Sequence, residues 1–80
     1  MELWIRSQDK KRLGQINFIE YGKDDYGYHL IGWRDKFEGT RLATYKTEER
    51  VLEVLDEIQE RVNFNIKLKV ETCVYEMPKE

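Results

Sequence analysis

Basic and polar side chains gather near the start of the chain, although the formal net charge of the whole chain is −2. The segment RSQDKKR supplies hydrogen-bond donors from Arg6, Ser7, Gln8, Lys10 and Arg12. Guanidinium groups bind phosphate and carboxylate oxygens through paired hydrogen bonds, and ammonium groups attract the same anions. We therefore expect this segment to be a turn that binds a small anionic, nucleotide-like ligand.

Aromatic residues and a second basic region could complete such a site. Trp4 and Tyr45 are candidates for stacking on a base, and Arg34 lies near Lys36 and Arg41. In a small sheet, however, aromatic residues more often fill the core or a subunit interface. A basic turn can also be merely solvated, so both interpretations stay open.

The sequence carries no catalytic signature. Nucleophilic catalysis needs a Ser, Thr or Cys beside an oriented base, and His29, the single histidine, lies inside a predicted strand. Asp24 and Asp25 are too few for a calcium site, and Glu53 and Glu57 occupy the solvent side of a predicted helix. We expect a protein that is not an enzyme, without a metal or a cofactor.

Charge and composition exclude further classes. A sequence pI near 5.5 argues against duplex nucleic acid as the main partner, because that affinity comes from clustered cations. Cys73 is the only cysteine, which fits a reducing compartment and a small buried side chain. No apolar stretch is long enough to span a bilayer and no signal-peptide pattern opens the chain, so a cytoplasmic location without a membrane partner is expected.

The first 45 residues predict about four strands with short connections. Alternation indicates strands over 2–6 and over 11–21, the second with a bulge at Gly14. A turn is expected at 22–27, a third strand at 28–33, a hairpin at 34–36 and a fourth strand at 37–45.

One helix and one further strand follow. Thr47 is a suitable N-cap, and one apolar stripe is formed by Val51, Val54, Leu55, Ile58 and Val62. Asn63 and Asn65 favour a helix end nearby. Alternation then predicts a strand whose inner face carries Ile66, Leu68, Val70 and Val74. The expected fold is a single α+β domain over 1–80, in the order β-β-β-β-α-β, with the helix packed on one face of a twisted, mainly antiparallel sheet.

Three segments carry a family resemblance: WIRSQDK at the start, TYKTEERVLEVLDEIQ at the start of the helix and VYEMPKE at the end. They resemble a family of small proteins of Gram-positive bacteria, their phages and integrative elements. The resemblance implies a phage or mobile-element protein in a bacterial host cell, and supplies no catalytic residues.

Two functions follow from the residues and the resemblance together. The first is sequestration of a nucleotide-like immune signal of the host, enclosed between the subunits of a homo-oligomer. The alternative is an inhibitor or assembly factor that binds a host protein through the acidic helix face or a sheet edge.

Overall fold

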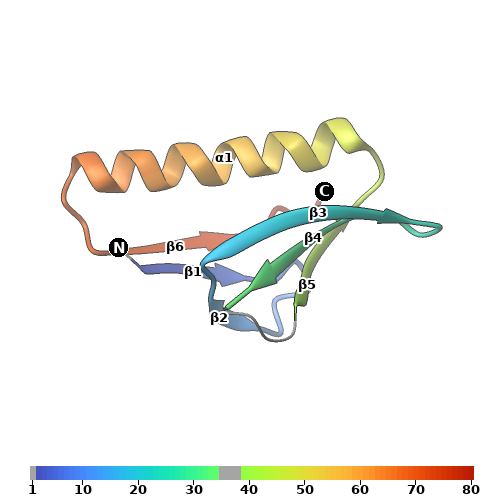
Figure 1. The fold of residues 1–80 in the computed structure, drawn as a ribbon, viewed down its shortest axis with the longest axis horizontal. Coiled ribbons are helices and arrows are strands. Elements are labelled where there is room, and N and C mark those ends of the chain that lie inside the picture. The colour runs from blue at the N-terminus through green and yellow to red at the C-terminus, as the bar shows by residue number, and fades with distance from the viewer. Residues whose placement is uncertain (1, 35–38) are drawn as a thin grey trace.

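The computed structural model describes residues 2–34 and 39–80 of the chain, and these form six strands and one helix. The predicted α+β class with a single helix is confirmed. In chain order the elements are β1 (Glu2–Arg6), β2 (Leu13–Gln15), β3 (Phe18–Asp24), β4 (Gly27–Trp33), β5 (Thr40–Tyr45), α1 (Glu48–Lys67) and β6 (Thr72–Glu76) (Figure 1).

The first sheet has the strand order β2-β1-β6. β1 pairs antiparallel with β2, which places Ile5 opposite Gly14, and parallel with β6, which places Leu3 opposite Cys73. A parallel pair cannot be joined by a tight turn. The chain accordingly passes through the second sheet and the helix before it returns to β6.

The second sheet is an antiparallel meander in the order β3-β4-β5. Leu30 of β4 lies between Tyr21 of β3 and Ala43 of β5 and is fully buried. The register of β4 and β5 shifts between Leu30 and Ile31, and such a bulge increases the local twist.

The prediction of one strand over 11–21 and of one continuous sheet is wrong. Ile16 and Asn17 form a corner at which the chain changes sheets. The Ile16 amide donates to the Leu3 carbonyl at 2.9 Å, in the first sheet, whereas the Asn17 amide donates to the Trp33 carbonyl at 3.0 Å, in the second. The phase change near Gly14 is therefore a sheet boundary, not a bulge.

One predicted turn also differs from the structure. The turn expected at 22–27 is shorter, because Gly22 and Asp24 pair with His29 and Gly27 and leave only Asp25 and Tyr26 between the strands. Residues 35 and 36 of the predicted hairpin, and the start of the fourth strand at residue 37, lie outside the described residues.

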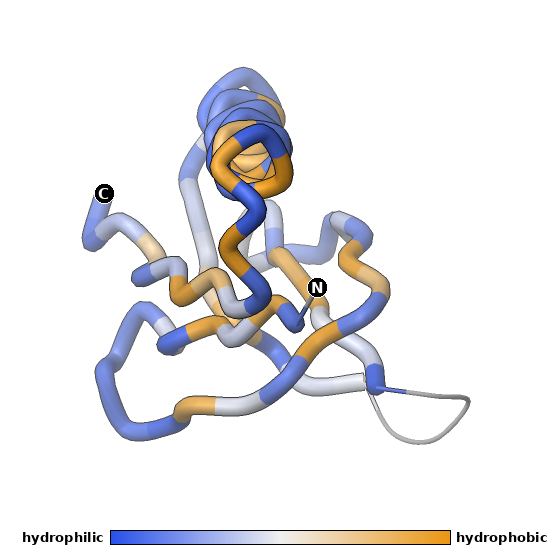
Figure 2. The backbone as a smooth tube through the Cα atoms, turned by 90° about the vertical axis from the view of Figure 1, so that its left-hand side faces the viewer, coloured by the Kyte–Doolittle hydropathy of each residue, from blue (hydrophilic) through white to orange (hydrophobic). Residues whose placement is uncertain are grey.

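The helix begins where the sequence predicted. The Thr47 hydroxyl accepts a hydrogen bond from the Arg50 amide at 3.1 Å, as an N-cap does. Val51, Val54 and Ile58 are buried against the strands, and Leu55 and Val62 pack against them. The helix contacts β4, β5 and β6 and lies on one side of the strands (Figure 2).

The prediction for the segment after the helix is wrong in register. Ile66 belongs to the last helical turn, and Leu68 and Val70 are exposed. β6 begins only at Thr72, which its parallel register pairs with Glu2 of β1. Its inner face consists of Cys73 and Tyr75, while Val74, expected inside, is 55% exposed.

One core joins the helix to both sheets. The largest fully buried side chains are Ile5, Leu30, Val51, Val54 and Cys73, which come from β1, β4, α1 and β6. The buried state expected for Cys73 is confirmed. The candidate site lies between the two sheets, beside this core.

Candidate functional site

The turn between β1 and β2 is held by its own polar side chains. Ser7, only 3% exposed, donates from its hydroxyl to Asp9 Oδ1 at 2.6 Å and accepts from the Arg12 amide at 3.1 Å. The Ser7 hydroxyl, followed by the Lys11 amide, holds the pKa of Asp9 below its ordinary value. Lys10 adopts a φ of 67°, in the left-handed region. Ser7 thus shapes the turn and has no free donor for a ligand.

Gln8 ties this turn to distant parts of the chain. Its Nε2 donates to the carbonyl oxygens of Thr44 at 3.1 Å, Pro78 at 3.3 Å and Lys79 at 2.9 Å. Its Oε1 accepts from the Thr44 amide at 3.0 Å. Gln8, expected to bind a ligand, is therefore saturated by β5 and the C-terminal segment.

Two of the predicted basic residues are also engaged. Arg6 Nε donates to the Lys10 carbonyl at 2.8 Å, and Lys10 forms an ion pair with Glu76 of β6. Both side chains are exposed, so each contact is worth little energy. They nevertheless direct these cations toward β6 and the turn backbone.

A cleft of about 510 Å³ opens between the two sheets, and we name it the inter-sheet cleft. Ligand pockets typically measure roughly 300–1,000 Å³. The first sheet and its turn contribute Ile5, Lys11, Arg12, Leu13, Gly14, Gln15 and Ile16, and the second sheet contributes Gly32, Arg34, Thr40 and Leu42. The predicted residues Arg12 and Arg34, which are 22 positions apart in the sequence, are thus brought to one cavity.

The lining of the cleft is cationic, with no carboxylate among the described residues that line it. Lys11, Arg12 and Arg34 are exposed, and none of them forms an ion pair with a carboxylate within residues 2–34 and 39–80. The apolar part of the lining comes from Ile5, Leu13, Ile16 and Leu42. An anion with an apolar or aromatic part matches this combination of surfaces.

Gly32 lines the cleft and lies close to two apolar side chains. A Cβ atom at this position would lie 2.7 Å from Leu42 Cδ1 and 2.9 Å from Ile16 Cδ1, both closer than side chains pack. A larger residue at this position would require the terminal methyl groups of Leu42 and Ile16 to shift.

The two predicted aromatic residues lie elsewhere. Trp4 is on the opposite side of β1 from the buried Ile5, and its Nε1 donates to Glu2 Oε2 at 3.4 Å. Tyr45 is 3% exposed, its hydroxyl donates to the Pro78 carbonyl at 2.7 Å, and burial raises its pKa to about 12. Neither ring lines the inter-sheet cleft.

Sequence reasoning did not assign Lys11, Gln15 and Thr40 to a site. Lys11 adjoins Arg12 in the basic segment and could have been included on that ground. No sequence pattern near Gln15 or Thr40 indicates a binding site, because the two residues come from different sheets and share the cleft only in the folded chain.

A second polar cluster surrounds the buried His29. Its Nδ1 lies 2.7 Å from Thr44 Oγ1 and its Nε2 lies 2.7 Å from Asp24 Oδ1. The bond to His29, followed by that from the Tyr26 amide, lowers the pKa of Asp24. The three residue types also occur in nucleophilic catalysis, but here His29 is only 4% exposed and links β3, β4 and β5 as a cross-strand brace.

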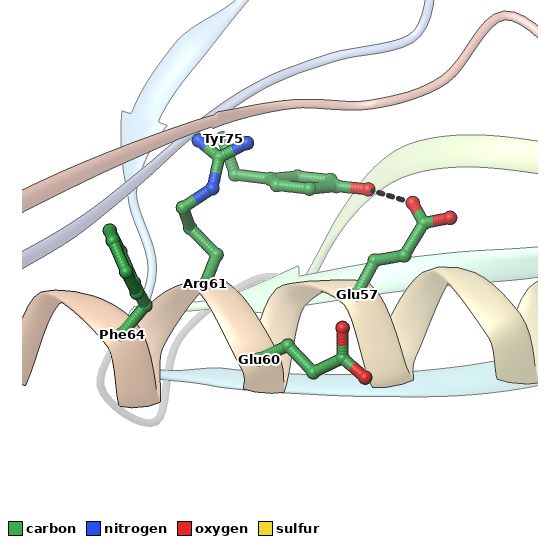
Figure 3. A pocket seen from close by; sticks show the side chains of 5 residues that line it. All are labelled: Glu57, Glu60, Arg61, Phe64 and Tyr75. Carbon is green, nitrogen blue, oxygen red and sulfur yellow. Dashed lines mark hydrogen bonds between the residues drawn. The ribbon is translucent and has the colours of Figure 1, made fainter.

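Two further hollows adjoin the helix. One, of about 410 Å³, is lined by Glu57, Glu60, Arg61, Phe64 and Tyr75 (Figure 3). The Tyr75 hydroxyl donates to Glu57 Oε2 at 2.7 Å, and Arg61 lies 5.7 Å from the centre of the tyrosine ring. With two glutamates, this hollow does not suit an anion.

The other hollow, of about 290 Å³, lies at the start of the helix beside the C-terminal segment. Arg50 donates to the backbone oxygen of Glu80 from Nε at 2.9 Å and from Nη2 at 2.7 Å. Arg50 is therefore engaged by the backbone of the C-terminal segment, and Tyr45, Lys46 and Lys79 line the same hollow.

Within the part of the chain that the structure describes, no group of three or more His, Cys, Asp and Glu side chains is arranged to hold a metal ion. No helix in the same residues is long and apolar enough to cross a membrane. Comparison of the chain with protein-family models, curated proteins and solved structures gives no match.

Proposed function

We propose that this protein binds a small anionic, nucleotide-like molecule in the inter-sheet cleft and sequesters it without converting it. The observation that carries the proposal is the meeting of Lys11, Arg12 and Arg34 around an apolar base. Arginine pairs of this kind suit phosphate oxygens, and the apolar side chains suit the flat part of a nucleotide.

The family resemblance supports the setting that we propose, a phage or mobile-element protein that acts in the cytoplasm of a bacterial host. There a captured immune signal of the host is a fitting ligand. Useful sequestration requires about nanomolar affinity, near −12 kcal/mol. An open cleft gains such affinity when a second subunit helps to enclose the ligand, which is why we propose a homo-oligomer.

The first experiment is a thermal-shift screen of the purified protein with cyclic dinucleotides, cyclic oligonucleotides and ADP-ribose derivatives. A ligand at a hundred times its Kd stabilises the folded state by about 2.7 kcal/mol, which is easily seen for a chain of this size. The ligand is then recovered and analysed by mass spectrometry. An intact ligand supports sequestration, whereas a degraded one contradicts the proposal of a protein without enzymatic activity.

A pair of double variants assigns the binding to the cleft. Arg12→Ala with Arg34→Ala removes two cations from the cleft and should weaken binding by about a hundredfold or more, since a hydrogen bond to a charged group contributes about 1.5–3 kcal/mol. Lys46→Ala with Lys67→Ala removes the same charge at exposed positions outside the cleft and should leave the affinity nearly unchanged. An equal loss of affinity in both double variants would show a nonspecific charge effect and would contradict the assignment of binding to the inter-sheet cleft.

The alternative function, binding of a host protein, is favoured by the acidic outer face of the helix. Asp56 and Glu60 are exposed there and form no ion pair with the described residues. Asp56→Lys with Glu60→Lys should abolish capture of such a partner and leave nucleotide binding intact. Glu57 is unsuitable for this test, because its substitution also breaks the bond to Tyr75.

A further inference from the structure

The four strands at the edges of the two sheets differ in how their outer backbone groups are satisfied. An edge strand presents unpaired amide and carbonyl groups, which proteins usually cover, shorten or protect with charges. β6 is covered by the helix, since Arg61 Nη1 donates to the Val74 carbonyl at 3.4 Å and Asn65 Nδ2 to the Thr72 carbonyl at 3.5 Å.

The outer edges of β5 and β2 are also protected against pairing with another strand. Gln8 donates from its backbone amide to the Leu42 carbonyl at 2.8 Å, and its side chain bonds both backbone groups of Thr44. β2 has only three residues, which is too short to template a partner strand.

β3 is the exception. It has seven residues and pairs only with β4, so its other edge has no hydrogen-bonded strand among the residues described. Phe18 at its start is 58% exposed and Tyr21 at its middle is 39% exposed. A strand of this length with exposed aromatic side chains is an open site for β-sheet extension.

The charged side chains of β3 do not protect this edge, because each is held by its own sheet. Glu20 accepts from Trp33 Nε1 at 3.1 Å, and Asp24 is bound to His29 at 2.7 Å. Lys23, the residue type most often used to protect an edge, lies 5.4 Å from the centre of the Tyr28 ring.

We infer that β3 is the interface at which a second copy of this chain adds antiparallel, to give a continuous six-stranded sheet in a twofold dimer. In a twofold antiparallel pair, one residue lies on the axis and faces its own copy. An axis at Glu20 would place Glu20 opposite itself, and an axis at Lys23 would place Lys23 opposite itself. An axis at Gly22 would place Glu20 opposite Asp24, again a pair of like charges.

An axis at Tyr21 avoids every such conflict. All seven residues of β3 then find a partner, Ile19 faces Lys23 and Phe18 faces Asp24, and the two Tyr21 rings face each other. The start of the helix lies near this strand, since the charge of Glu48 raises the pKa of Tyr21. In this register no like charges face each other and every residue of β3 is paired, so the edge of β3 is complementary to a second copy of itself.

The test uses charge substitutions at the axis, measured by sedimentation equilibrium over a range of protein concentrations. The wild-type protein should dimerise reversibly. Tyr21→Glu and Tyr21→Lys each place like charges face to face and should raise the dissociation constant by about tenfold. An equimolar mixture of the two variants should recover the lost affinity, because Glu then faces Lys. Tyr26→Glu, the same change at an 85% exposed turn position, is the matched control and should dimerise as the wild type does.

Hydrogen exchange on the wild-type protein tests the interface without substitution, since amides of β3 should become better protected as the concentration rises. A monomer at every concentration would overturn the inference and would leave the edge to a strand of another protein. If the Tyr21 variants dimerise with the dissociation constant of the wild type, the interface is not at β3. If both variants are folded but their mixture still dimerises weakly, the register with Tyr21 on the axis is wrong.

Discussion

At the scale of single residues, His29 and its partners show how a polar group is accommodated in a small core. Both ring nitrogens are satisfied, by Thr44 and by Asp24, so the buried imidazole does not carry the cost of an unpaired polar group. The same arrangement stabilises Asp24 in its ionised form and holds its pKa below the ordinary value.

This arrangement predicts a dependence of stability on acid. A carboxyl group whose pKa is lower in the folded state stabilises the fold above its unfolded pKa, near 3.9, and this contribution is lost as the pH falls through the folded value. The free energy of unfolding, measured by urea titration between about pH 5 and pH 2, should therefore decline less steeply in Asp24→Asn than in the wild type. Asp25→Asn, the neighbouring carboxyl in the turn, is the control. Identical slopes for wild type and Asp24→Asn would contradict the role of Asp24.

At the scale of elements, the helix was predictable and the strands were only partly so. Thr47 and the stripe through Val51, Val54 and Ile58 are local signals that the structure retains. The alternation in 66–71 is also a local signal, but it carries no information on whether a neighbouring strand is present to pair with. In the structure Ile66 and Lys67 complete the helix and the chain then turns, with Lys69 at a φ of 59°.

The helix start gives a prediction of its own. Thr47→Ala removes the hydroxyl that accepts from the Arg50 amide and should lower the free energy of unfolding by about 1 kcal/mol. Thr47→Ser retains the acceptor and should cost much less. Chemical denaturation of both variants beside the wild type measures the difference, and equal losses would show that the cap bond contributes nothing.

At the scale of the whole molecule, the candidate site exists only because the fold brings side chains of both sheets to one cleft. The sequence marked Arg12 and Arg34 as possible ligand-binding residues, yet nothing local indicates that they share a cavity. It also marked Ser7, Gln8 and Tyr45, whose side chains the structure uses for internal bonds. Such tertiary bonds link residues up to 71 positions apart, which a pattern within one short segment cannot reveal.

Gln8 makes the largest number of these long-range bonds and should be important for stability. Gln8→Ala would leave the backbone groups of Thr44 without their partners and release the segment 78–79. We expect a loss of about 1–3 kcal/mol in the free energy of unfolding. Gln59→Ala, at an exposed helix position, should change stability by less than about 0.5 kcal/mol. A Gln8 variant as stable as the Gln59 variant would refute this tertiary role.

The buried thiol of Cys73 can also be used to measure how often the core opens. The side chain is 1% exposed, on β6, with β1 on one side and the helix above, and it is the only cysteine in the chain. A thiol-reactive dye can label it only when this part of the core opens, so the labelling rate measures the opening equilibrium directly. Ligand in the cleft or a partner on β3 would slow that single reaction, which allows both to be followed without attaching any probe to the surfaces involved.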